Sequence, residues 1–127
     1  KSLLAESIQG CNTRYEQERE GIKCFIKFAV NNPNIYNVIW GSLAIDKKLF
    51  VDYYSSFAES YTNALVQSSN EVQAPDPTTV AYMLMGISNF VGLRAIFEDM
   101  NNEDIDRIIE ETIMPVLSNG IFKNCEK

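Results

Sequence analysis

The stretch that decides the fold is DPTTVAYMLMGISNFVGLRAIF, residues 76–97. It opens with a helix-start signal, because the Asp76 carboxylate can accept hydrogen bonds from unpaired first-turn amides and Pro77 suits the first helical position. From Val80 to Phe97, only four residues carry polar side-chain atoms: Tyr82, Ser88, Asn89 and Arg94. The sequence therefore predicts a long, mostly apolar helix.

Apolar side chains fall on nearly every side of this helix when residues are placed at about 100° intervals. One side carries Val80, Leu84, Ile87 and Val91. Another side carries Met83, Gly86, Phe90 and Phe97. Such a helix must be covered all round, and a chain of 127 residues can cover about two-thirds of its circumference. We therefore expect a second subunit to cover the rest, which makes the protein a homodimer.

The apolar run 80–93 is interrupted by Ser88 and Asn89 and is followed by Arg94. It falls short of the ~20 residues that span a bilayer, so we expect a buried helix and no membrane partner. The three cysteines, Cys11, Cys24 and Cys125, are too few and too far apart for a disulfide framework. A reducing compartment follows, and we expect a cytoplasmic protein.

The composition suits one globular domain over residues 1–127, with 46% apolar and 11% aromatic residues. The net charge is −6, and residues 98–111 hold seven acidic residues against one basic residue. Without clustered Lys and Arg, this chain is not expected to bind nucleic acid itself. Histidine is absent, which excludes Ser-His-Asp catalysis, and no glycine-rich phosphate loop occurs. We expect no enzyme, no cofactor and no metal site.

Helical periodicity continues before this stretch. The first predicted helix carries a stripe of Leu4, Ile8, Cys11 and Tyr15. The charged run 16–21 is predicted to end it, and a second helix covers residues 22–30. Asn32 is the expected N-cap of a third helix over residues 33–44.

The remaining helices have their own start and stop signals. Asp46 can cap a fourth, aromatic helix, and residues 67–75 form a polar loop. The last helix opens at Asn101, should kink at Pro115 and should stop at Gly120. No segment alternates with the two-residue period of a strand, so the sequence predicts an all-α, six-helix domain.

This order of helices resembles a known family. Its marks are PNIYNVIW at residues 33–40, the Asp76-Pro77 helix start and LSNGI at residues 117–121. The chain looks like the C-terminal effector-binding and dimerisation domain of TetR-type transcriptional regulators. The resemblance implies a preceding helix-turn-helix domain of about fifty residues, missing from this chain, which binds operator DNA. It also implies that residues 1–7 start the linking helix, and that the helices of residues 77–100 and 102–119 form an intersubunit four-helix bundle.

The resemblance places a ligand pocket between the middle helices. Its candidate wall is aromatic and flexible: Phe25, Phe28, Trp40, Tyr54, Phe57, Tyr61, Met83, Ile87 and Phe90. Tyrosine hydroxyls and Asn89 would supply polar contacts to a small hydrophobic or amphipathic effector. The alternative is that these side chains form an ordinary aromatic core.

Candidate dimer contacts lie on the last two helices: Gly92, Ile96, Ile105, Ile109, Ile113 and Val116. The isoleucines could instead fill the subunit's own core. Gly92 could let two helices of different subunits cross, or it could relieve crowding within one subunit.

Two functions remain open at this stage. In the first, the chain is the ligand-sensing and dimerisation domain of a regulator, and an effector shifts the linking helix and so the spacing of the two DNA-binding domains. In the second, it is a free-standing helical dimer that binds a hydrophobic small molecule or a protein partner and has no DNA role. The coding sequence upstream of Lys1 distinguishes them.

Overall fold

A computed structural model describes residues 6–123. Within this range the chain forms helices and turns and no strand, which confirms the all-α class. The helices are α2 (Arg14–Asn31), α3 (Ile35–Ile45), α4 (Lys47–Gln67), α5 (Pro77–Phe97), α6 (Asn102–Ile108), the π-helical turn η1 (Ile109–Ile113) and α7 (Met114–Asn119). Because α6, η1 and α7 follow one another without a break, they act as one long helix. Leu4 and Cys125 lie outside the described residues.

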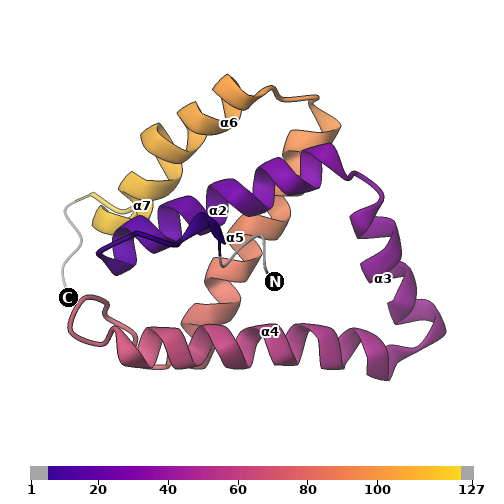
Figure 1. Ribbon diagram of the computed structural model, residues 1–127, viewed down its shortest axis with the longest axis horizontal. Helices are drawn as coiled ribbons and strands as arrows, with labels where there is room; N and C mark the ends of the chain where they lie inside the picture. Colours follow the sequence, from indigo (N-terminus) through magenta and orange to yellow (C-terminus); the bar gives the residue numbers. More distant parts are fainter. Residues whose placement is uncertain (1–5, 124–127) are drawn as a thin grey trace.

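Figure 1 shows α5 crossing the molecule from the end of α4 to the start of α6 and passing α2 on the way. The short α3 connects the end of α2 to the start of α4. The α6–α7 unit runs along α2 on the side away from α4. α5 is therefore the element shared by both halves of the molecule.

Two apolar clusters hold these helices together. The larger joins α2, α5 and the α6–α7 unit through Ile22, Ile26, Ala95, Ile105, Ile109, Ile113 and Met114. The smaller joins α4 and α5 through Leu65, Ala81 and Leu84. In α3, by contrast, only Tyr36 is buried. The core thus lies under α2, α5 and α6, and α3 contributes little to it.

The local start and stop signals are confirmed. The carboxylates of Asp46 and Asp76 each accept a hydrogen bond from the backbone amide three residues further on. Asn101 and Asp104 form a reciprocal capping box at the start of α6. α7 ends at Gly120, whose φ of +80° suits glycine.

The predicted helix break at residues 16–21 is wrong, since α2 is capped by Thr13 and continues through this run. The Arg14 guanidinium pairs with the Glu18 carboxylate one turn later, which supports the helix that the charges were expected to interrupt. The break falls earlier, where Gly10 adopts a φ of +88°. The first predicted helix therefore does not extend to residue 15.

Asn32 is not the N-cap of α3. Its side-chain amide donates to the Phe28 carbonyl oxygen (2.9 Å), so it caps the C-terminal end of α2. Its own carbonyl accepts from the Ile35 amide (3.0 Å), which closes a turn through Pro33 before α3 begins. An amide side chain can cap either end of a helix, and here it donates to a backbone carbonyl that has no partner within α2.

Ahead of Pro115 the long C-terminal helix widens into the π-helical turn η1. Proline has no amide to donate and its ring collides with the carbonyl four residues earlier, so the helix needs extra room there. The distortion expected from the sequence is present in this form.

α5 corrects another expectation. It is one continuous helix of 21 residues that is long and apolar enough to cross a membrane, although core helices meet the same test. The subunit covers less of this helix than the two-thirds expected from the sequence, because only 28% of its most apolar 18-residue window is buried. Most of α5 is therefore left uncovered by the described residues of its own subunit.

Candidate functional site

The two opposite faces of α5 are both apolar. The buried face, which packs on α2 and α4, carries mostly small residues: Ala81, Leu84, Met85, Gly92 and Ala95. The opposite face, which we call the α5 stripe, consists of Met83, Gly86, Phe90, Leu93 and Phe97. Met83, Phe90 and Phe97 are 61%, 64% and 77% exposed. The steps along the stripe are three, four, three and four residues, which is the spacing of a helix seam that packs on another helix.

Two glycines of α5 differ in their surroundings. A Cβ atom at Gly92 would lie 2.7 Å from the Tyr36 hydroxyl oxygen, so α5 needs a glycine there to pack against its own subunit. A Cβ at Gly86 would meet nothing within 4 Å. Crowding within the subunit thus explains why position 92 has no side chain. None of the described residues lies close enough to position 86 to explain a glycine there.

An open groove of about 530 Å³ lies between α3 and the C-terminal half of α5; we call it the α3–α5 groove. Its aromatic wall is made by Tyr36, Trp40 and Phe97, and Asn34 and Asn37 add carboxamides at one side. Among the described residues that line it, none is charged. The groove therefore offers apolar surface and amide hydrogen-bonding groups.

Behind the groove, polar groups of α3, α4 and α5 bind one another around Asn89. The Tyr36 hydroxyl donates to the Asn89 backbone carbonyl (2.7 Å). The Trp40 indole donates to the Tyr54 hydroxyl (3.3 Å), which in turn lies 3.4 Å from the Asn89 side-chain oxygen. Burial disfavours the charged phenolate and, with the neighbouring Tyr54, raises the pKa of Tyr36 to about 12. These bonds, rather than a core cluster, hold α3 in place.

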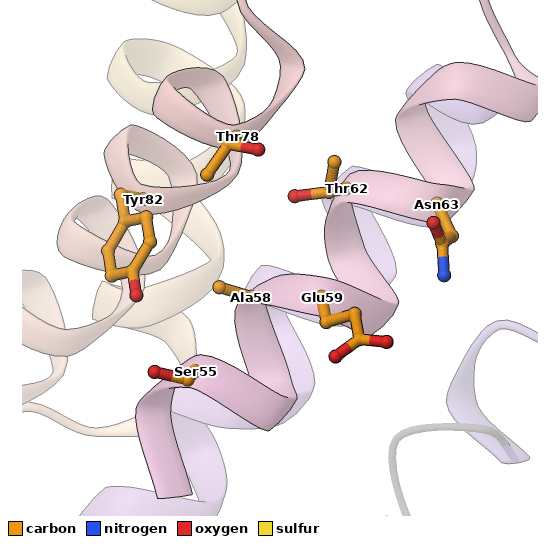
Figure 2. A pocket seen from close by; sticks show the side chains of 7 residues that line it. All are labelled: Ser55, Ala58, Glu59, Thr62, Asn63, Thr78 and Tyr82. Carbon is orange, nitrogen blue, oxygen red and sulfur yellow. The ribbon is translucent and has the colours of Figure 1, made fainter. Parts of the chain in front are cut away.

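A second groove, of about 290 Å³, lies between α4 and the N-terminal half of α5. Figure 2 shows Ser55 and Thr62 of α4 turned toward α5, whereas Glu59 and Asn63 point to the other side of α4. Its lining residues are mostly polar: Ser55, Ala58, Glu59, Thr62, Asn63, Thr78 and Tyr82. It contains none of the nine aromatic and apolar residues predicted from the sequence for a ligand pocket.

A buried ion pair fixes the start of α2. Glu18, only 8% exposed, accepts from the Arg14 guanidinium (2.5 Å) and from the Tyr61 hydroxyl of α4. The Arg14 backbone amide donates to the Glu71 carboxylate (2.8 Å) in the loop after α4. Burial and the Glu18 charge raise the pKa of Tyr61 far above its usual range. The first turn of α2 is therefore tied to α4 by charge-assisted hydrogen bonds.

The nine residues predicted to line a ligand pocket do not surround one groove. Six of them are partly buried: Phe25, Phe28, Tyr54, Phe57, Tyr61 and Ile87. Trp40, Met83 and Phe90 are exposed. Trp40 alone lines a described groove, with the Phe90 ring 6.1 Å away between centroids. Sequence reasoning did not assign Tyr36, Leu93 and Phe97 to the pocket, although their i, i+4 spacing to Trp40 and to each other was visible.

The six residues predicted for a dimer contact divide into two groups. Gly92, Ile105, Ile109 and Ile113 are buried within the subunit, in line with the alternative of an internal core. Ile96 lines the α3–α5 groove and Val116 is 36% exposed. The most exposed apolar side chains of α5 are instead Met83, Phe90 and Phe97 of the α5 stripe.

No protein-family model matches this chain, and no curated protein sequence matches it either.

Proposed function

We propose that this chain is the ligand-sensing and dimerisation domain of a TetR-like transcriptional regulator, and that two copies associate through the α5 stripe. The observation that carries the proposal is the stripe itself, a heptad-spaced row of large apolar side chains opposite the buried face of α5. The order of the helices along the chain agrees with the resemblance seen in the sequence.

A second copy is the partner that best suits the stripe. A two-fold interface brings one patch against its own copy, so a straight, uncharged row of apolar residues is self-complementary. Gly86 lies inside this row, and it lacks a Cβ where the subunit itself would tolerate one. Two helices that cross at Gly86 can approach closely because no Cβ atom separates their backbones. A dimer contact would therefore explain a glycine at this position.

The α7 end of the long C-terminal helix supplies further apolar surface. Val116 and Leu117 are 36% and 37% exposed. In a four-helix bundle each subunit contributes two helices, and these side chains would extend the contact beyond α5. Phenylalanine side chains bury roughly 150–250 Å² each, so Phe90 and Phe97 of both copies would form the largest part of the contact.

The regulatory step would couple a ligand to DNA through α2. A small apolar effector that binds between α3 and α5 acts only by its different affinity for two conformations. The start of α2, held by Arg14 and Glu18, follows the predicted linking segment, so a shift there would change the separation of the two DNA-binding domains. Half-sites are spaced by roughly 34 Å, and a displacement of a few ångströms weakens operator contacts. DNA contact would belong to the preceding domain, because this chain has a net charge of −6.

Sedimentation velocity on the 127-residue chain between about 1 and 100 µM tests the dimer. We expect a concentration-dependent dimer that Met83→Glu weakens at least about tenfold, because a charge in an apolar seam loses its water. Leu49→Glu is the matched control, since Leu49 is 59% exposed on α4 and Met83 61% on α5. A monomer over the whole range, or equal effects of the two variants, would contradict the proposal.

The link to DNA needs a separate experiment. If the reading frame upstream of Lys1 encodes a helix-turn-helix domain, the full-length protein should bind its operator as a dimer, and Met83→Glu should weaken that binding. A start codon directly before Lys1 would favour the free-standing dimer instead.

A further inference from the structure

Two residues belong both to the α5 stripe and to the α3–α5 groove. Leu93 and Phe97 line the groove and are the last two positions of the stripe. Phe97 is 77% exposed, so one edge of the groove consists of a side chain that the subunit leaves mostly uncovered. Whatever packs on the C-terminal half of the stripe must also lie along this edge.

The groove is large enough for a small molecule but is open to solvent. Its volume of about 530 Å³ is within the usual range of ligand pockets, which bury about 70–90% of a drug-sized ligand. A ligand in an open groove keeps much of its apolar surface in water. A second wall is needed before the groove can hold a ligand firmly.

The lining indicates the chemistry of that ligand. Tyr36, Trp40 and Phe97 present aromatic rings, and no described lining residue carries a charge that could pair with a charged ligand. Asn34 and Asn37 can donate to a carbonyl or accept from a hydroxyl. An uncharged aromatic molecule with one hydrogen-bonding group fits these surfaces.

We propose that the α3–α5 groove binds an uncharged aromatic small molecule and that the α5 stripe of a second copy forms its outer wall. This inference rests on the proposed dimer and adds that the site is complete only in the dimer. Ligand binding and dimerisation are then linked, so each strengthens the other by the same factor.

The chain is well suited to a direct test, because its single tryptophan, Trp40, lines the groove. The probe is prodan, an uncharged naphthalene ketone that accepts energy from tryptophan. We expect energy transfer from Trp40 to bound prodan, and a dimer dissociation constant at least about tenfold lower with saturating prodan, measured by sedimentation. The charged analogue 1-naphthalenesulfonate should bind much more weakly; equal binding would overturn the ligand class.

Two pairs of variants separate the groove from the stripe. Gly41 lines the groove outside the stripe, and nothing lies within 4 Å of a Cβ placed there. Gly41→Phe should abolish prodan binding and leave dimerisation without prodan unchanged, and Gly41→Ala is the control for the change in helix propensity. Met83→Glu should weaken prodan binding by the factor by which it weakens the dimer, and Leu49→Glu should not.

The outcomes distinguish this inference from the proposed function. If the chain dimerises through the stripe but prodan leaves the dissociation constant unchanged, the shared site is wrong and the dimer stands. If prodan binds Met83→Glu as tightly as the unaltered chain, one subunit suffices and the inference is wrong. If the chain stays monomeric with and without prodan, both the inference and the proposed dimer are overturned.

Discussion

The buried face of α5 and the α5 stripe lie on one helix, yet they are built from different side chains. The buried face uses alanine and glycine at Ala81, Gly92 and Ala95, which bring α5 close to its neighbours. The stripe places larger side chains such as Phe90 and Phe97 in the solvent. A lone subunit would gain more by burying the phenylalanines and exposing the alanines. α5 therefore packs closely within the subunit through small residues and leaves its large apolar side chains exposed.

The strongest test of this comparison removes a side chain from the internal core. Ile109→Ala should lower the free energy of unfolding by about 2–5 kcal/mol, because Ile109 is fully buried in the larger cluster and its loss leaves a cavity. Urea unfolding followed by circular dichroism measures this loss. We expect the same loss at low and high protein concentration, with Val116→Ala as the partly exposed control. If stability is lost only at concentrations where the dimer forms, Ile109 contributes to the dimer interface and not to the core of the subunit.

Gly92 offers a second test on the buried face. Gly92→Ala should destabilise the subunit by about 1–3 kcal/mol, because the new methyl group must displace the Tyr36 hydroxyl or the helix. Tyr36→Phe removes that hydroxyl together with its hydrogen bond to Asn89. The double variant should therefore lose less than the sum of the two single changes in urea unfolding. Strict additivity would mean that the two groups do not collide.

Gly86 is the matching test on the α5 stripe, with a smaller expected effect. Gly86→Ala should stabilise the subunit by about 0.5–1 kcal/mol, because alanine is the better helix former and has open space there. Urea unfolding in the Met83→Glu background, at a protein concentration where sedimentation shows that variant as a monomer, measures this gain.

In the unaltered background the same change should weaken the dimer, since the methyl group separates the two helices. Sedimentation velocity measures that loss. A change that stabilises the subunit and leaves the dimer intact would show that the helices do not cross at Gly86.

The features that the sequence predicted correctly are local ones. Asp46, Asp76 and Asn101 cap the helices they precede, and Gly120 ends the last helix, because each signal acts within one turn of backbone. The prediction that Asn32 caps the start of α3 was wrong, because its side-chain amide can cap the end of one helix or the start of the next. The predicted helix break at residues 16–21 was wrong, because opposite charges one turn apart stabilise a helix and do not by themselves indicate a loop.

The site could be predicted only in part, for a different reason. An apolar face on the last helix shows that Ile105 and Ile109 are covered, but not whether their own subunit or a partner covers them. In α5 the apolar residues lie on all sides, so no amphipathic pattern marks the buried face. Which side is buried depends on α2 and α4, and that information is spread over distant parts of the chain.

The smallest expected effect concerns pH and the contact of α3 with the buried face of α5. Because the pKa of Tyr36 in the folded protein is about 12, above the value of ~10 for an unfolded tyrosine, its contribution to stability is complete below about pH 10. It is lost as the pH rises from about 10 toward 12, since the unfolded chain then releases this proton first.

Tyr36→Phe should therefore make thermal unfolding less sensitive to pH in that range, although it lowers the melting temperature at neutral pH by removing one hydrogen bond. Absorbance at about 295 nm should show one fewer late-ionising tyrosine, and Tyr82→Phe controls for the loss of one phenol. An unchanged alkaline titration in Tyr36→Phe would mean that this hydroxyl is open to water, and that α3 does not close over the buried face of α5 in solution.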